Sequence, residues 1–285
     1  MAVYTLPKHL HPDFAVKGRK PVGAVEIDRE NWAANGLVAM CIFNDGGRNL
    51  VQGRLPDIDL NGVSTSIENG SSCLKLDGTS KYAKIPAASF PVNDITIAVT
   101  YLLRSNDDEM LTGLNYTDNQ NQCDFYISGA RSSIQWHLAG WDVAGNPVLS
   151  EGRNLGVVYT VLGTRNGSTV KLFVYNHSTG EITEDVGAAS NSTPIGIAAG
   201  YSMLIGADAD SGSEGSLGNY ADANIYNFTV WGKGINDAEA HSFLKDPYQI
   251  LKPAVPISYF TAAAAAGFEP QWYRNRSAII GAGMK

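Results

Sequence analysis

Apolar and polar side chains alternate along several short segments of the chain. Residues 224–231, with the letters NIYNFTVW, alternate with the period of two that indicates a β-strand. The same reasoning predicts further strands at residues 94–103, 125–127, 133–138, 157–162 and 169–175. Clusters of Gly, Asn, Asp or Ser separate these segments and mark turns. Short strands at this spacing predict a β-sandwich of two packed sheets.

A short helix is predicted directly after the strand at residues 224–231. Asn236 offers a side-chain oxygen for the helix N-terminus, and Glu239 follows three residues later, which together form a capping box. Asp246 and Pro247 then end the helix. Upstream, residues 74–86 (LKLDGTSKYAKIP) predict a β-hairpin, because Asp77 and Gly78 suit a tight turn.

These segments resemble the laminin-G-like branch of the concanavalin A-like jelly rolls. The chain shows that family's closing order of an Ile205-Gly206 strand, a gap, a hydrophobic strand and a helix with Ala238-Glu239. Residues 74–86 are similar to its early L-x-F-D-G-x-x-x-Y-V-x-I-P pattern. The resemblance covers residues 35–250. It implies an all-β, concanavalin A-like jelly-roll sandwich of two antiparallel sheets with one short C-terminal helix. Function stays open, because this fold carries lectins, hydrolases and structural modules.

Length and composition favour a single domain with extended ends. The chain has 285 residues, 44% of them hydrophobic, and 30 glycines, which suits one turn-rich sandwich with a sizeable core. We predict an extended N-terminal arm at residues 1–34, the sandwich at 35–251 and an extended C-terminal arm at 252–285. The net charge of −7 argues against a nucleic-acid partner. No Lys/Arg-rich amphipathic stretch indicates a membrane partner.

The N-terminus shows no apolar core of a secretory signal peptide, so we expect synthesis in the cytoplasm. Three cysteines, Cys41, Cys73 and Cys123, lie in or beside apolar segments. We interpret them as buried free thiols, the alternative being one disulfide with one thiol left over.

The two arms are rich in proline and lack periodicity. Residues 21–47, and the ending around Trp272 and Ile279, resemble jelly-roll proteins of tailed-bacteriophage virions. That resemblance implies a host-made virion protein bound to the major capsid protein or other virion proteins, and a homo-oligomer. The basic C-terminal tail suits an acidic capsid surface. The predicted assembly contacts are Phe14, Trp272, Tyr273, Arg274, Arg276 and Ile279.

Three carboxylates near the N-terminus raise the question of catalysis. Glu26, Asp28 and Glu30 reproduce the E-x-D-x-E spacing of a retaining β-glucanase family that shares the fold, and on a strand they would share one face. In that family the motif lies inside the sandwich. Here it precedes the predicted domain, with the charged Arg29 in the inward position. We therefore interpret it as a solvated strand or linker.

An acidic loop is a candidate calcium site. Asp208, Asp210 and Glu214 stand at positions 1, 3 and 7 of a Gly-containing loop, and calcium selects such hard oxygen ligands. The loop lacks the glycine and glutamate positions of the helix-loop-helix calcium pattern. A plain polar loop is the alternative, and no other cofactor is expected.

Aromatic residues are candidates for glycan binding, because sugar rings stack on aromatic faces. Trp136, Trp141 and Tyr126 lie near one another in sequence. Trp136 shares a strand face with Ile134 and Leu138, which favours burial in the core. Trp141 follows a glycine in a loop and is the better binding candidate.

Three functions from different classes follow from these patterns. The first is a structural virion protein, a capsid-bound decoration or reinforcing protein that docks through its arms and exposes a lectin-like sandwich. The second is a carbohydrate-binding module of a phage tail or fibre that recognises host glycans. The third is a glycoside hydrolase. Nucleophile, zinc and phosphate-loop motifs are absent from the sequence, so we expect no enzymatic activity.

Overall fold

A computed structural model gives the fold of the protein. It describes residues 3–5, 20–21, 24–51, 56–68, 70–86, 94–105, 107, 109–113, 123–128, 133–138, 147–149, 153–188, 202–209, 217–254 and 258–260. Within these ranges strands predominate, and α1 (Asp237–Lys245) is the one α-helix. No helix in the described ranges is long and apolar enough to cross a membrane.

Eight strands form the larger of two packed antiparallel sheets. Their order is β14, β13, β12, β7, β18, β5 and β4, with β3 beside β18. The bounds are β3 (Leu37–Cys41), β4 (Thr65–Glu68), β5 (Ser71–Lys75), β7 (Ile95–Leu103), β12 (Val158–Asn166), β13 (Thr169–Asn176), β14 (Ile182–Ala188) and β18 (Ala223–Trp231). Several strands pair with strands that are distant in the sequence, as β7 does with β18.

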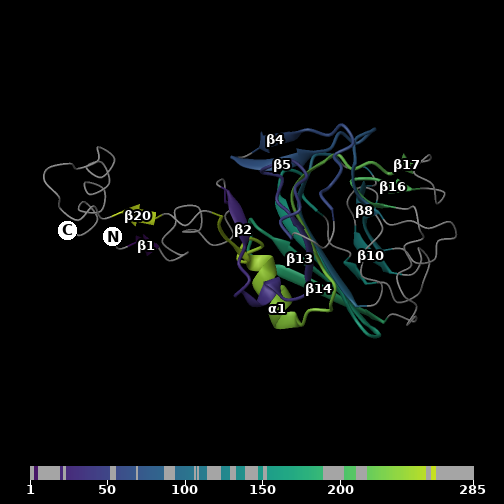
Figure 1. Ribbon diagram of the computed structural model, residues 1–285. Helices are drawn as coiled ribbons and strands as arrows, with labels where there is room; N and C mark the ends of the chain where they lie inside the picture. Colours follow the sequence, from purple (N-terminus) through teal and green to yellow (C-terminus); the bar gives the residue numbers. More distant parts are fainter. Residues whose placement is uncertain are drawn as a thin grey trace, which may run out of the picture.

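Six strands form the second sheet, on the side of the sandwich away from α1 (Figure 1). Their order is β11, β10, β9, β8, β15 and β6. The bounds are β6 (Ala83–Pro86), β8 (Glu109–Gly113), β9 (Cys123–Ile127), β10 (Ile134–Leu138), β11 (Val148–Leu149) and β15 (Ser202–Ile205). The jelly-roll sandwich expected from the sequence is thereby confirmed.

Three two-stranded sheets complete the described structure. They pair β2 (Val25–Ile27) with β19 (Leu251–Pro253), β16 (Asp208–Ala209) with β17 (Leu217–Gly218), and β1 (Val3–Thr5) with β20 (Ser258–Phe260). Figure 1 shows β1 and β20 apart from the sandwich. By contrast, β2 and the 3-10 helix η3 (Trp32–Ala34) contribute Ile27, Ala33 and Ala34 to a buried cluster with α1. Part of the segment expected to be an arm thus packs on the sandwich, while the proposed domain boundaries stay a prediction.

The main core lies between the two sheets. Trp136 and Phe125 of the six-stranded sheet pack there with ring centroids 5.8 Å apart. Trp136 also lies against Gly163 of β12, where a Cβ atom would approach the indole to 2.3 Å. No larger residue fits at that position without moving the tryptophan, so this close approach fixes how the sheets stack.

Helix α1 begins and ends as the sequence predicted. Asn236 accepts a hydrogen bond from the Glu239 amide at 3.0 Å, and Glu239 returns one to the Asn236 amide at 2.9 Å. The helix covers part of the outer face of the eight-stranded sheet. Phe243 meets Trp231 edge-on there, with ring centroids 4.8 Å apart. Every residue of β18 is therefore buried, on one face by the core and on the other by α1 and its neighbours.

The predicted hairpin at residues 74–86 is wrong. The strands β5 and β6 do form there, but they lie in different sheets. The segment between them crosses from one sheet to the other and is held by hydrogen bonds to the loop before β18, including Gly78 N–H to the Ala221 carbonyl at 3.0 Å. A tight turn between two strands has the same sequence signature as this crossing, because both need a residue with positive φ, here Gly78 at 73°.

Two of the three cysteines lie in the packed interior as free thiols. Cys41 and Cys73 are both fully buried, and neither forms a disulfide. Burial raises the pKa of the Cys41 thiol well above its ordinary value. The side chain of Cys123 falls outside the described residues. The two described thiols therefore act as small core side chains.

Candidate functional site

The outer face of the six-stranded sheet, which points away from the eight-stranded sheet, carries polar side chains in place of apolar ones. In β9 and β10 the residues Phe125, Ile127, Ile134, Trp136 and Leu138 belong to the core between the sheets. Because successive strand residues point to opposite faces, the residues between them point outward. These outward residues are Asp124, Tyr126, Gln135 and His137.

A buried acid–histidine pair lies at the centre of this face. Asp124 and His137 are direct register partners on β9 and β10, and the His137 Nδ1 atom lies 2.8 Å from Asp124 Oδ1. Their side chains are 0% and 1% exposed. Burial raises the pKa of Asp124, and the adjacent imidazole opposes that shift. A buried charge of this kind persists only when a partner compensates it, so the two side chains form one unit.

The pair extends into a chain of polar contacts along the same face. Nε2 of His137 lies 2.8 Å from Oε1 of Gln135, whose amide nitrogen donates to Ser133 Oγ at 3.4 Å. Ser133 in turn shares a 2.7 Å hydrogen bond with Ser128. We call these five residues, Asp124, Ser128, Ser133, Gln135 and His137, the polar network. Both imidazole nitrogens of His137 thus lie within 2.8 Å of a side-chain oxygen of the network.

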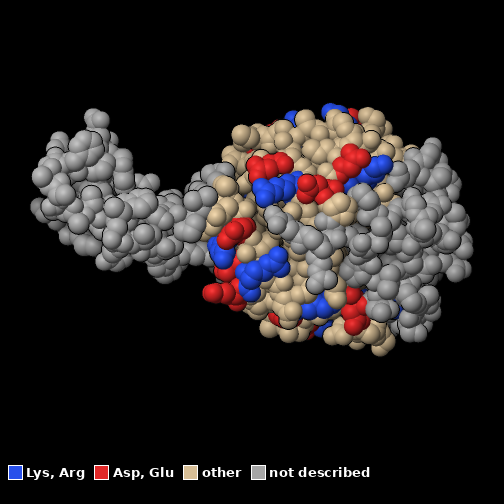
Figure 2. Space-filling view, in the orientation of Figure 1, with Lys and Arg blue, Asp and Glu red and all other residues tan. Residues whose placement is uncertain are grey.

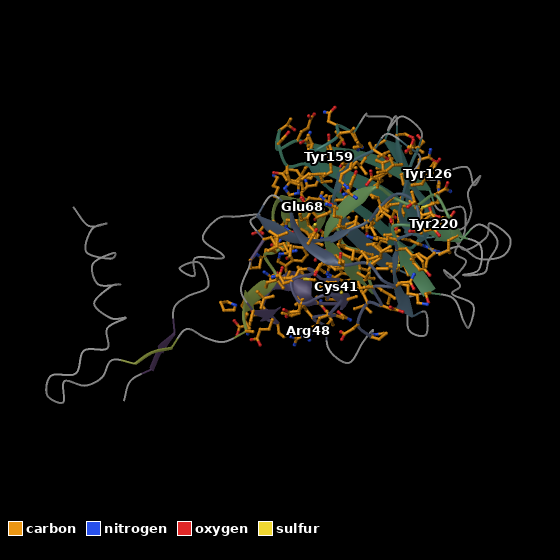
Figure 3. All side chains as sticks on the ribbon, turned by 90° about the horizontal axis from the view of Figure 1, so that it is seen from above. Cys41, Arg48, Glu68, Tyr126, Tyr159 and Tyr220 are labelled. Carbon is orange, nitrogen blue, oxygen red and sulfur yellow. The ribbon has the colours of Figure 1, made fainter. Side chains whose placement is uncertain are left out.

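An aromatic row continues across the sheet from the polar network. Tyr126 stacks on His137 with ring centroids 6.0 Å apart and 28° between the planes. It pairs in register with Met110 of β8, which also bridges to Tyr220. Figure 3 shows Tyr126 and Tyr220 on the same side of the molecule. The Tyr220 ring lies 6.5 Å from that of Tyr82.

Tyr82 and Tyr220, which we call the tyrosine pair, are partly exposed. They pack against Leu204, Ala207 and Leu217 in a small cluster separate from the main core. Leu204 alternates with two core residues of β15, so this cluster lies on the outer face. Burial, and then the neighbouring Tyr82 and Asp77, raise the pKa of Tyr220, so its hydroxyl stays protonated and able to donate a hydrogen bond.

A rigid turn places Tyr82 at this edge. Oδ1 of Asp77 accepts hydrogen bonds from the backbone amides of Thr79, Ser80 and Lys81 at 2.9 to 3.0 Å. Burial alone would raise the pKa of Asp77, but these amides and the Ser80 hydroxyl hold it well below its usual range. The turn that joins the two sheets is thereby fixed just before Tyr82.

The structure separates the residues that the sequence grouped as a glycan site. Trp136 is fully buried between the sheets, as its alternation indicated. Tyr126 lies on the outer face, where 8% of its surface is exposed. Trp141 lies outside the described residues. Of the described residues of that prediction, Tyr126 lies on the polar face, whereas Trp136 is buried on the core side and is not placed to contact a glycan.

The predicted calcium loop is described only at its first residue. Asp208 is 4% exposed and pairs with Gly218 between β16 and β17. Asp210 and Glu214 lie outside the described residues. Among the residues that are described, no group of three acidic, histidine or cysteine side chains gathers where a metal ion would bind. A calcium site there stays a prediction.

The other predicted sites lie elsewhere on the molecule or outside the described residues. Glu26 in β2 makes an ion pair with Lys252 at 3.5 Å, and Asp28 accepts a 3.4 Å hydrogen bond from the Glu30 amide. These carboxylates are placed as surface groups on a short strand and turn. The predicted assembly contacts Phe14, Trp272, Tyr273, Arg274, Arg276 and Ile279 lie outside the described residues.

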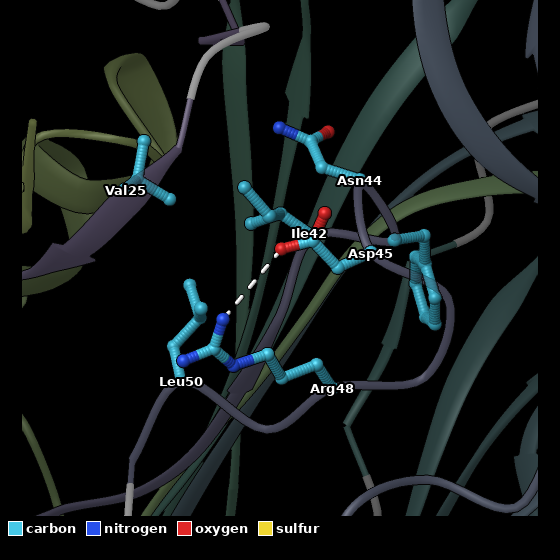
Figure 4. A pocket seen from close by; sticks show the side chains of 7 residues that line it. Val25, Ile42, Asn44, Asp45, Arg48 and Leu50 are labelled. Carbon is cyan, nitrogen blue, oxygen red and sulfur yellow. Dashed lines mark ion pairs between the residues drawn. The ribbon is translucent and has the colours of Figure 1, made fainter. Parts of the chain in front are cut away.

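A small surface pocket lies elsewhere, between β2 and the segment that follows β3 (Figure 4). Val25, Ile42, Asn44 and Leu50 line it, and an exposed Arg48–Asp45 ion pair of 3.7 Å crosses it. Screened surface pairs of this kind hold little binding energy. We therefore place the candidate functional site at the polar network and the tyrosine pair.

Sequence reasoning missed the polar network and the tyrosine pair. The signal for the first was present, since Asp124 and His137 occupy the polar positions of two alternating segments. Only the register of β9 against β10 brings them together, and this register cannot be deduced from the sequence of either segment. The tyrosine pair joins positions 138 residues apart through the strand order of the sheet.

No protein-family model and no curated protein sequence matches this chain. Several solved structures share its fold. Tailspike protein 2 of an Escherichia coli O157:H7 bacteriophage matches with a TM-score of 0.51 and 14% identity, over 73% of this chain and 30% of that one. Domain 4 of an extracellular arabinanase from Geobacillus stearothermophilus, solved with arabinotriose, matches with 0.50 and 12%, over 74% and 98%.

The sialidase of Trypanosoma rangeli matches with a TM-score of 0.50 and 13% identity, over 76% of this chain. This chain spans only 33% of the sialidase and 30% of the tailspike. At such identities the likeness establishes the fold alone. The chain is thus an all-β sandwich of a kind found in proteins that act on or bind carbohydrates, and within a phage tailspike.

Proposed function

We propose that the protein is a non-catalytic carbohydrate-binding domain whose binding face is the outer face of the six-stranded sheet. One observation carries the proposal: the tyrosine pair stays partly exposed beside the polar network on a sheet face that α1 does not cover. Sugar rings have apolar faces that stack on tyrosine and hydroxyls that need hydrogen-bonding partners. Domain 4 of the arabinanase, which shares the fold and was solved with arabinotriose, supports the same class of ligand.

The arrangement of this face favours binding over hydrolysis. Glycoside hydrolysis ordinarily uses two carboxyl groups placed on either side of the scissile bond. In the polar network, Asp124 is the one carboxylate, and it is fully buried against His137. Ser128 and Ser133 bond to each other instead of to the imidazole, so they do not build a nucleophile–base pair. Absence of enzymatic activity is accordingly part of the proposal.

A glycan array tests the proposal with four proteins. Wild type should bind a defined set of glycans, and Tyr220→Ala and Tyr82→Ala should each lose roughly tenfold or more in affinity, since stacked aromatics dominate such sites. Tyr175→Ala is the matched control, because Tyr175 is a partly exposed tyrosine on the eight-stranded sheet, beside His177. Binding that survives both tyrosine-pair substitutions, or that is lost equally in Tyr175→Ala, would contradict the assignment.

A second candidate role concerns the place of this domain in an assembly. The strands β1 and β20 join segments near the two ends of the chain and lie apart from the sandwich (Figure 1). An element that extends away from the domain suits contact with other proteins, and a phage tailspike shares the fold. We propose a virion component, a capsid-bound decoration protein or a tail module, that docks through its ends and presents the glycan-binding face. Its partners would be the major capsid protein, other virion proteins or copies of itself.

Particle association tests this second role separately from glycan binding. A chain lacking residues 255–285 should lose incorporation into phage particles while keeping the glycan affinity of the full chain. Immunogold labelling of purified particles would then show head or tail as the location. Normal occupancy of particles by the shortened chain would refute docking through the C-terminal segment.

The surface charge on the described face agrees with these partners. Figure 2 shows Lys and Arg side chains beside Asp and Glu side chains around α1 and β2, with the two signs interspersed. Lys171 and Asp237 form one such pair at 2.6 Å, and Lys233 and Glu239 another at 3.5 Å. Nucleic-acid interfaces need a continuous basic surface. The mixed pattern and the net charge of −7 favour neutral or weakly charged partners.

A further inference from the structure

The eight-stranded sheet has a gap in the middle of one edge of β18. On that edge β5 pairs with Asn224 and Ile225, whereas β3 pairs with residues 228–231. Tyr226 lies between the two partners, at a point where the pairing of β18 with β7 also shifts register. Backbone groups of β18, of β5 and of the end of β3 therefore point into this gap.

Three backbone carbonyl oxygens converge on this gap, and one lysine side chain fills it. The carbonyls belong to Ile42, directly after β3, to Ser72 in β5, and to Tyr226 in β18. Nζ of Lys20 donates to all three, with 3.1 Å to the Tyr226 oxygen. An ammonium group has three donors and no acceptor, so the number and direction of the partners match. Lys20 is 5% exposed.

The residue that follows Lys20 is held at the same place. The Pro21 carbonyl accepts a 2.8 Å hydrogen bond from the side-chain amide of Asn44. The amide oxygen of Asn44 in turn accepts from the Ser72 hydroxyl. Figure 4 shows Ile42 and Asn44 on the segment after β3, next to Val25. Asn44 and Ser72 thus stand on the two sides of the gap and hold the backbone beside Lys20.

We propose that this gap is a lysine-binding site, and that Lys20 occupies it to fasten the N-terminal segment of its own chain to the sandwich. Carbonyl dipoles, not a carboxylate, provide the attraction at the three contacts. The planar fork of an arginine would not direct its donors at three points around one atom. Burial lowers the pKa of Lys20 to about 7, so the ammonium form with its three donors predominates below that pH, where the tests are made.

Chain connectivity favours Lys20 of the same chain over that of a second copy. Pro21 is fixed by Asn44, and β2 begins at Val25 and pairs with β19 on the same sandwich. Three residues, 22–24, join these two anchored points. So short a connection ties the gap and β2 of one sandwich to one chain.

Chemical rescue tests the site in the full-length protein. Lys20→Ala removes the atoms from Cγ to Nζ, for which n-propylammonium is a close replacement. We expect Lys20→Ala to melt roughly 5 °C below wild type, since carbonyls left without a donor cost stability. Millimolar n-propylammonium should restore most of that loss, and 1-propanol should not. Lys17→Ala, which changes the preceding lysine of the sequence, should melt like wild type with or without the amine.

Hydrogen exchange locates the effect if the melting shift is small. Lys20→Met keeps most of the length of the side chain without the donors, so amides of residues 24–27, 42–44 and 72–74 should exchange several times faster than in wild type. Unchanged exchange in Lys20→Met, or failure of n-propylammonium to stabilise Lys20→Ala above its effect on wild type, would overturn the site. A wild-type dimer that Lys20→Met converts to monomer would overturn the assignment to the same chain.

Discussion

The outer face of the eight-stranded sheet is apolar where α1 crosses it, whereas the outer face of the six-stranded sheet carries the polar network. On the first face Leu162, Phe173 and Trp231 meet Phe243 and Leu244 of the helix. On the second face Asp124 and His137 occupy equivalent central positions. The two faces differ in side-chain polarity because α1 packs on only one of them. A covering helix allows apolar residues outside the sandwich, whereas the face without a described helix carries a buried polar pair whose members compensate each other.

The largest effect should come from removing the contact between α1 and its sheet. Trp231 is fully buried, donates a 2.7 Å hydrogen bond to the Ala33 carbonyl and packs against Phe243. Trp231→Ala should lower the free energy of unfolding by about 4 kcal/mol, the usual cost of emptying a large core site. Urea denaturation measures it. Ile67→Ala is the control, because Ile67 is 78% exposed and should change stability by less than about 0.5 kcal/mol.

Breaking the polar network tests the other face of the comparison. Asp124→Ala leaves His137 buried without its partner and should cost about 3 kcal/mol of unfolding free energy. The double variant Asp124→Leu/His137→Phe replaces the pair by apolar groups and should recover most of that stability. If the double variant is as unstable as Asp124→Ala, the network is needed for the fold itself. If it is stable and loses glycan binding, the network positions the aromatic residues of the proposed binding face.

A pH titration tests a buried imidazole on the outer face of the eight-stranded sheet. Beyond α1, His177 on that face shares a 2.8 Å hydrogen bond with Thr160, and burial lowers its pKa to about 4. Between that value and the ordinary pKa near 6.5, the unfolded chain binds a proton that the folded chain does not. Stability should therefore fall by about 3 kcal/mol as pH drops from 7 to 4. His177→Gln should flatten that part of the curve in thermal melts, and an unchanged slope would contradict the buried neutral imidazole.

Local sequence signals predicted some features of the fold. Other features depend on pairing between strands that are distant in the sequence. The capping box of Asn236 and Glu239 lies within four residues, so the sequence located α1 correctly. The placement of Trp136 in the core followed from its alternation. By contrast, the segment at residues 74–86 was misread as a hairpin, because its turn chemistry does not reveal which sheet each strand joins. The Lys20 site depends on a register shift at Tyr226 between strands distant in sequence. No local pattern announces such a gap.

Two N-terminal deletions that differ by one residue should give the smallest change in melting temperature. They test how the N-terminal segment is attached to the gap in the eight-stranded sheet. A chain that begins at Lys20 after its initiator Met keeps the ammonium group, and we expect it to melt within about 2 °C of wild type. A chain that begins at Pro21 loses the group and leaves the Ile42, Ser72 and Tyr226 carbonyls without their donor, so it should melt roughly 5 °C lower. Differential scanning calorimetry measures both. Glycan affinity should be equal in the two chains, because the gap opens in the eight-stranded sheet and the tyrosine pair lies on the other one. Equal melting of the two chains would mean that Lys20 rests in the gap without stabilising it.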